Sequence, residues 1–115
     1  MDSSLFIYDF LCGFSEELSF AVKKGKGGFI DKKGHKVIDF VYDKNVFDRI
    51  GYECFHDGVA VLRKGGLFGC IDKQGNVKIP FKYDWMDRFS EGLSVVSIGY
   101  AQGFVDMEGN EAWIY

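Results

Sequence analysis

The sequence predicts an all-β fold, a tandem repeat of three-stranded antiparallel meanders. One stretch occurs three times without gaps: a leading Phe, an acidic residue two places later, alternating apolar residues, and then Gly-x-(Ile/Val)-Asp-x-x-Gly. Its copies are Phe14–Gly34, Phe55–Gly75 and Phe89–Gly109. The composition agrees, because 12 Phe, 6 Tyr, 2 Trp, 15 Gly and a single Pro favour short strands joined by tight turns.

A second shared motif, Phe-x-Tyr-Asp, sets the length of the repeat. It begins at Phe6, Phe40 and Phe81, and Tyr115 falls where a fourth copy would begin, giving spacings of 34, 41 and 34 residues. We therefore divide one domain, residues 1–115, into the units Phe6–Asp39, Phe40–Pro80 and Phe81–Ile114. Such repeats bury a continuous core only by stacking on their neighbours, and we expect either a curved open sheet or a closed pseudo-threefold barrel.

Within a unit, the first strand alternates between larger and smaller apolar residues, so one face is predicted as core and the other as half covered. The second strand is short and closes on Asp-x-x-Gly, which suits a type I turn because Asp favours the first place and Gly the fourth. The first strands are predicted at Leu18–Lys23, Val59–Lys64 and Leu93–Ile98. The second strands are predicted at Gly28–Lys32, Gly69–Lys73 and Gly103–Met107.

The third strand alternates most clearly, with Ile79, Phe81 and Tyr83 on one predicted core face. Pro80 indicates an edge strand or a bulge, because it has no N–H to donate to a ladder. A four-residue link, Trp85–Arg88, then leads to the next unit, and we interpret it as one helical turn capped by the preceding Asp.

These motifs resemble the WG-repeat family, bacterial tandem repeats with a pattern close to F-x-E-G-L-A-x-V, W-G-(F/Y)-I-D-x-x-G and I-P…Y-D. The similarity covers nearly the whole chain. The namesake Trp-Gly pair is replaced by Gly27-Gly28, Phe68-Gly69 and Gln102-Gly103, and Glu17 stands where the other units have glycine. The resemblance implies a β-rich repeat with a binding or scaffold role, and it brings no common catalytic residues.

The repeated carboxylates are interpreted as turn and cap residues, since acid/base catalysis or a calcium site would require them to converge on one point. We expect no metal and no cofactor, because the glycine turns match no nucleotide-binding loop and the three cysteines lack CxxC spacing. Cys54 and His56 could face the same side of an extended segment as a thiolate–imidazole pair, but no third orienting residue accompanies them.

The middle link, Lys44–Cys54, is eleven residues long and is the one long stretch that the repeat does not require. Loops on rigid scaffolds carry function disproportionately. The predicted partner-binding residues are therefore in this loop and in the corresponding link of the next unit: Asp48, Arg49, Tyr52, Glu53, Trp85 and Met86.

The sequence thus predicts a non-enzymatic interaction or scaffold module that binds a protein or peptide. The alternatives are a small-molecule or carbohydrate-binding domain that uses Trp85, Trp113 and Tyr52, and an enzyme that uses Cys54 and His56. A net charge of -3 argues against nucleic acid, and the lack of a signal peptide pattern or membrane span predicts a cytoplasmic protein. The half strands Phe6–Asp9 and Glu111–Tyr115 are expected to pair, closing the domain or forming a homo-oligomer through terminal strand edges.

Overall fold

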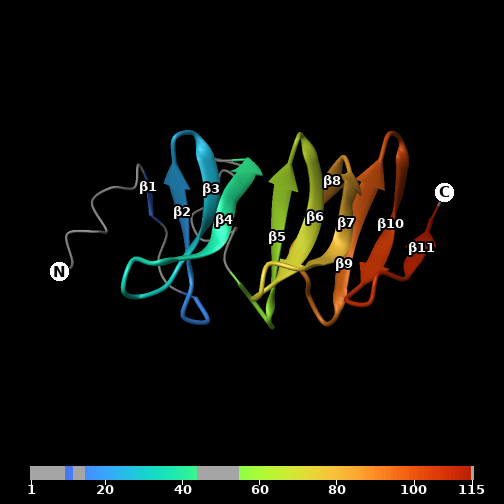
Figure 1. The fold of residues 1–115 in the computed structure, drawn as a ribbon. Helices are drawn as coiled ribbons and strands as arrows, with labels where there is room; N and C mark the ends of the chain where they lie inside the picture. The colour runs from blue at the N-terminus through green and yellow to red at the C-terminus, as the bar shows by residue number, and fades with distance from the viewer. Residues whose placement is uncertain (1–9, 12–14, 44–54, 115) are drawn as a thin grey trace.

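The computed structural model describes residues 10–11, 15–43 and 55–114, which form eleven strands and no helix (Figure 1). Within this part of the chain, therefore, no helix is long and apolar enough to cross a membrane. The strands are β1 (Phe10–Leu11), β2 (Ser19–Lys23), β3 (Lys26–Ile30), β4 (Lys36–Asp43), β5 (Val59–Lys64), β6 (Leu67–Asp72), β7 (Val77–Tyr83), β8 (Trp85–Met86), β9 (Leu93–Ile98), β10 (Ala101–Asp106) and β11 (Glu111–Trp113).

The strands form three separate antiparallel sheets with the orders β1-β2-β3-β4, β5-β6-β7 and β11-β10-β9-β8, here named the first, second and third sheets. They follow one another along the long axis of a molecule measuring 50 × 24 × 22 Å, with β1 and β11 at opposite ends (Figure 1). The predicted all-β class and its antiparallel meanders are confirmed. The two predicted arrangements, one curved sheet or a closed barrel, are wrong, because the units meet face to face.

The first strands match their predicted bounds to within one residue, whereas the second strands begin two residues earlier than predicted. The cause is the turn between them, which is only two residues long. In the first two sheets both turn residues have positive φ: Lys24 at 54° and Gly25 at 84°, then Gly65 at 62° and Gly66 at 87°. Such turns match the twist of a hairpin and let pairing run up to the turn itself.

The link Trp85–Arg88, predicted as a helical turn, instead forms strand β8. Trp85 and Met86 pair with Ser97 and Val96 of β9. The amide of Asp84 also donates to the carbonyl of Ser97, at 2.9 Å. The free edge of β9 thus satisfies backbone groups that a single isolated helical turn would leave to water.

Two cores lie between the sheets. We call one side of each sheet the front face and the opposite side the back face. The front face carries Leu18 and Phe20 in the first sheet, Val59 and Val61 in the second, and Leu93 and Val95 in the third. The first core joins Leu18, Phe20 and Phe29 on the front of the first sheet to Leu62 and Ile71 on the back of the second. The second core likewise joins the front of the second sheet to the back of the third.

The third strand contributes to both cores, contrary to the prediction that Ile79, Phe81 and Tyr83 share one face. Ile79 and Tyr83 belong to the second core, whereas Phe81 packs against the first. A register shift between β6 and β7 causes this switch, since Phe68 pairs with Tyr83 but Cys70 pairs with Ile79. Pro80 lies in this edge strand beside the shift, as predicted.

Candidate protein-binding face

The first contact between consecutive sheets is polar and comes from the turn that precedes the first strand. The hydroxyl of Ser15 donates to the carbonyl of Phe55 at 2.6 Å. The carboxylate of Glu16 accepts from the amide of Gly58 at 3.0 Å and pairs with Lys73 at 3.2 Å. Glu16 was predicted to serve its own turn, but its side chain reaches into the next sheet.

The aspartate of Phe-x-Tyr-Asp makes a second contact of this kind. Asp43 accepts from the amide of Gly66 at 3.0 Å and from Nε of Arg63 at 3.0 Å. Asp84 accepts from the amide of Gly99 at 2.6 Å. Each carboxylate therefore binds the hairpin turn of the following sheet. The predicted role as the cap of a helical turn is wrong for Asp84, because strand β8 follows it; the link that follows Asp43 lies outside the described residues.

The aspartates of Asp-x-x-Gly, in contrast, are turn residues as predicted. Each carboxylate accepts from the amides two and four residues further on, as Asp72 does from Gln74 and Asn76 at 2.9 Å. The hydrogen bonds from the residue four places on are the main cause that lowers the pKa of Asp31, Asp72 and Asp106 below 3.8.

The third sheet differs from the other two because its front face is open. Leu93, Val95 and Phe104 are 47%, 44% and 37% exposed. Their equivalents in the other two sheets are all no more than 8% exposed: Leu18, Phe20 and Phe29, and Val59, Val61 and Cys70. Val95 and Phe104 are direct cross-strand neighbours, so the exposed side chains form one apolar surface. We call this surface, Leu93 with Val95 and Phe104, the terminal face.

The back face of the third sheet reverses the prediction from alternation. Its residues Ser94 and Val96 were expected to be half covered, yet they are 1% and 0% exposed. The face expected to be core is the exposed one. The back faces of the second and third sheets pack on the sheet before them, and a front face needs a sheet after it.

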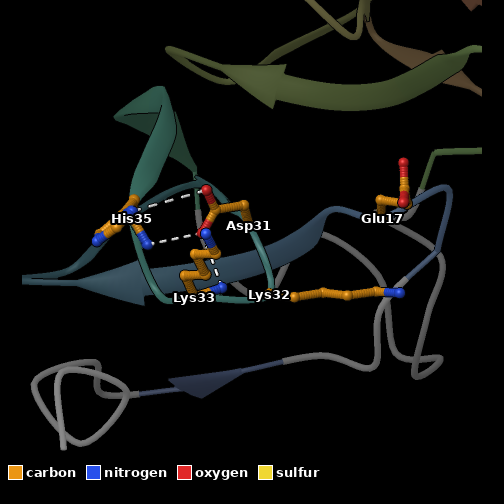
Figure 2. Close-up of a pocket in the computed structure, with 5 residues that line it drawn as sticks. All are labelled: Glu17, Asp31, Lys32, Lys33 and His35. Carbon is orange, nitrogen blue, oxygen red and sulfur yellow. Dashed lines mark hydrogen bonds and ion pairs between the residues drawn. The ribbon is translucent and has the colours of Figure 1, made fainter. Parts of the chain in front are cut away.

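Figure 2 shows a shallow depression at the first Asp-x-x-Gly turn, lined by Glu17, Asp31, Lys32, Lys33 and His35. The carboxylate of Asp31 is already engaged there by the amides of Lys33 and His35, both at 2.9 Å. The lining carries charges of both signs and no Phe, Tyr or Trp side chain. It lacks the stacking surface that the predicted carbohydrate site would use.

The predicted partner-binding residues fall in different places. Asp48, Arg49, Tyr52 and Glu53 lie outside the described residues, as does Cys54. Trp85 is 42% exposed, with its ring centroid 5.2 Å from that of Phe68. Met86 is fully buried in the second core.

The side chains that would support catalysis or metal binding are not brought together in the described part of the chain. It contains no cluster of three or more His, Cys, Asp or Glu side chains that could hold a metal ion. His56 lies 3.6 Å from Asp57 on the surface. Burial raises the pKa of the Cys70 thiol to about 12, so this thiol stays protonated at neutral pH. Cys70 is therefore a core side chain without a reactive thiolate.

The half strand Glu111–Tyr115 forms β11 over its first three residues and pairs with β10. Its proposed partner, Phe6–Asp9, lies outside the described residues. Among those described, β11 is one of the two edge strands of the third sheet, with β8 at the other edge. A homo-oligomer through this edge stays a prediction.

Sequence reasoning missed the terminal face as a site. A signal was present, because Leu93 and Val95 align with core positions of two earlier units and no complete unit follows them in this sequence. Aligned core positions identify a face, but whether it is covered depends on the neighbouring sheet.

Comparison with protein families gives one result that agrees with this geometry. The family model described as WG containing repeat matches residues 28–68 and 68–100, which is more than half of the chain. No curated protein and no solved structure gave a significant match. With its repeated sheets and its matched sequence, the chain belongs to the WG-repeat family.

Proposed function

We propose that this chain is a non-enzymatic interaction module that binds a protein partner through the terminal face. The supporting observation is the exposure of Leu93, Val95 and Phe104 at positions that are buried in both other sheets. A contiguous exposed apolar surface on a small protein is typical of a site of protein association. The loop Lys44–Cys54 and Trp85 stay candidates for additional contacts.

Binding of a small molecule or carbohydrate has less support. Such a site needs a concave pocket lined by aromatic side chains. Trp85 packs on Phe68, and the ring centroid of Trp113 lies 6.4 Å from that of Tyr83. The depression in Figure 2 includes neither tryptophan.

Affinity capture with matched variants tests the proposal. The test variant, Leu93→Glu with Val95→Glu, places two charges on the terminal face. The control variant, Val37→Glu with Val41→Glu, changes two valines of β4 in the first sheet that are 45% and 37% exposed. Partners captured by the natural chain are identified, purified and measured against all three proteins by calorimetry.

We expect the test variant to lose at least tenfold in affinity and the control variant to keep the natural value. Both variants should keep the natural circular dichroism spectrum and unfolding midpoint, because the substituted side chains are exposed. Equal affinities for the three proteins would rule out the terminal face as the binding site.

A further inference from the structure

The terminal face continues an interface that occurs twice inside the molecule. In both cases the front of one sheet packs on the back of the next, and the front-face positions become buried. The third sheet keeps the apolar character of that face. It therefore has the shape and chemistry for one more sheet of the same kind.

The third sheet also keeps the polar residues of the first interface. Ser90 and Glu91 occupy the positions of Ser15 and Glu16, and the residue types are identical. In the first sheet these two bind the Phe55 carbonyl and the Gly58 amide of the following sheet. In the third sheet both residues are exposed.

The second interface shows which partner residue accompanies this pair. In the second sheet the equivalent residues are His56 and Asp57, which pair with each other at 3.6 Å. The following sheet has Met107 where Lys73 stands in the second sheet. Within this chain, the sheet that follows Ser-Glu thus has lysine at this position, and the sheet that follows His-Asp has methionine there.

A second copy of this chain does not offer the required surface. The only back face without a preceding described sheet is that of the first sheet, and its residues Ser19, Ala21 and Ile30 are 1%, 0% and 0% exposed. Head-to-tail stacking of two copies would need that face to be open.

Taking the proposed function as its basis, we propose that the terminal face binds the open back face of a WG-repeat sheet carried by another polypeptide, with Ser90 and Glu91 as its polar contacts. The partner sheet presents small and aliphatic residues like Ala60, Leu62 and Ile71. It also presents the turn amide that corresponds to Gly58 and a lysine that corresponds to Lys73.

A longer chain supplies such a sheet as a defined probe. In this longer chain, residues 1–112 are followed by residues 38–115, so that Ile38 takes the place of Trp113. A second copy of the second sheet then follows the third sheet, and its back face can pack on the terminal face as it packs on the first sheet in the natural chain. Cys12 and Cys54 are replaced by Ser. A single Leu93→Cys substitution is then made either in the first copy of the third sheet or in the second, which is again terminal, and maleimide labelling rates are measured.

We expect the first-copy cysteine to react at least tenfold more slowly than the second-copy cysteine, which serves as the matched control in the same protein. Equal rates in a chain whose circular dichroism shows all sheets folded would overturn the inference. They would leave the proposed function standing, since that is tested separately with captured partners.

The natural chain provides a second test that does not depend on the longer chain folding. Ser15→Ala with Glu16→Gln should lower the unfolding midpoint, whereas Ser90→Ala with Glu91→Gln should leave it unchanged because the partner sheet is absent. Equal losses would show that Ser90 and Glu91 serve within this chain and would overturn the inference. So would a labelling rate at Leu93→Cys that falls with protein concentration, since a second copy would then cover the face.

Discussion

Glu17 occupies a backbone position that the other two repeats give to glycine. Its φ is 70°, and Gly58 and Gly92 at the same place have φ of 82° and 81°. The residue before each also has positive φ, and the flanking residues exchange two backbone hydrogen bonds, as Ser15 and Leu18 do at 2.9 and 3.1 Å. The Phe-x-Glu-Gly motif is therefore a two-residue type I′ turn, in which glycine avoids steric strain.

We expect Glu17→Gly to stabilise the protein. Relief of left-handed strain gains roughly 1–2 kcal/mol, and the greater freedom of glycine in the unfolded chain offsets about 0.5–1 kcal/mol of this gain. The net gain of roughly 0.5–1 kcal/mol corresponds to an increase of about 2–6 °C in the thermal midpoint. Thermal unfolding followed by circular dichroism measures it.

Gly92→Ala is the matched control for this turn. No atom lies within 4 Å of the added methyl group, so only the positive φ opposes the substitution. We expect a loss of about 1 kcal/mol. A decrease in stability for Glu17→Gly together with no change for Gly92→Ala would contradict the strain argument.

At the scale of the element, the third strand of each sheet passes so close to the Trp-Gly position that its second residue must be glycine. A methyl group on Gly69 would lie 2.7 Å from the carbonyl oxygen of Ile79 and 2.8 Å from Cγ of Phe81. A methyl group added to Gly28 or to Gly103 would likewise lie 2.6 Å from a carbonyl oxygen of the third strand of its sheet. In the second sheet the register shift accompanies this close approach, since the shift adjoins Gly69 and the Phe81 ring lies over the bare glycine backbone.

We therefore expect Gly69→Ala to be strongly destabilising. Overpacking at such a site costs about 1–3 kcal/mol, and the backbone oxygen of Ile79 cannot move without breaking the β6–β7 ladder. Urea unfolding measures the loss. Gly58→Ala adds the same methyl group in open space and should cost only about 1 kcal/mol through its positive φ. Similar midpoints for the two variants would argue against close approach as the reason for glycine.

The strands themselves could be predicted from the sequence, because alternation and turn residues are local signals. The register shift could not. Ile79, Phe81 and Tyr83 have the period of a regular strand, and only Pro80 and Gly69 indicate a departure from it. Strand β8 was missed for a related reason, since Trp85 and Met86 are too few to show a period and are ordered by the free edge of β9.

At the scale of the whole molecule, alternation assigns residues to faces but does not say how the faces meet. The first strand of the second sheet has Val59 and Val61 on one face and Ala60 and Leu62 on the other, and all four are buried. An apolar strand with two covered faces fits a barrel with outer cover as well as a stack of sheets. The exposure of the terminal face could not be predicted for the same reason. Leu93 and Val95 alternate like core residues, and the alternation does not say whether another sheet covers them.

Asp43 shows how the sheets are held in register with one another. It belongs to the first sheet, its side chain is 16% exposed, and it binds Arg63 and Gly66 of the second sheet as well as Lys26 of its own, whose Nζ lies at 3.6 Å. Burial acts to raise the pKa of Asp43, but the Gly66 amide and the cations of Arg63 and Lys26 outweigh it and hold the pKa below 3.8. Its contribution to stability is therefore present near neutral pH and is lost as the pH falls through the folded-state pKa.

We expect Asp43→Ala to lower the free energy of unfolding by about 1.5–3 kcal/mol, because charge-assisted hydrogen bonds between the first and second sheets are lost. Asp43→Asn should lose less, since its amide oxygen still accepts from Gly66. Asp39→Asn is the control: this side chain is 69% exposed, and its change should stay within about 0.5 kcal/mol. Urea unfolding at pH 7 and pH 3 measures all three, and the gap between Asp43→Asn and the natural chain should narrow at pH 3. A gap that widens in acid would mean that the carboxylate is not the group joining the sheets.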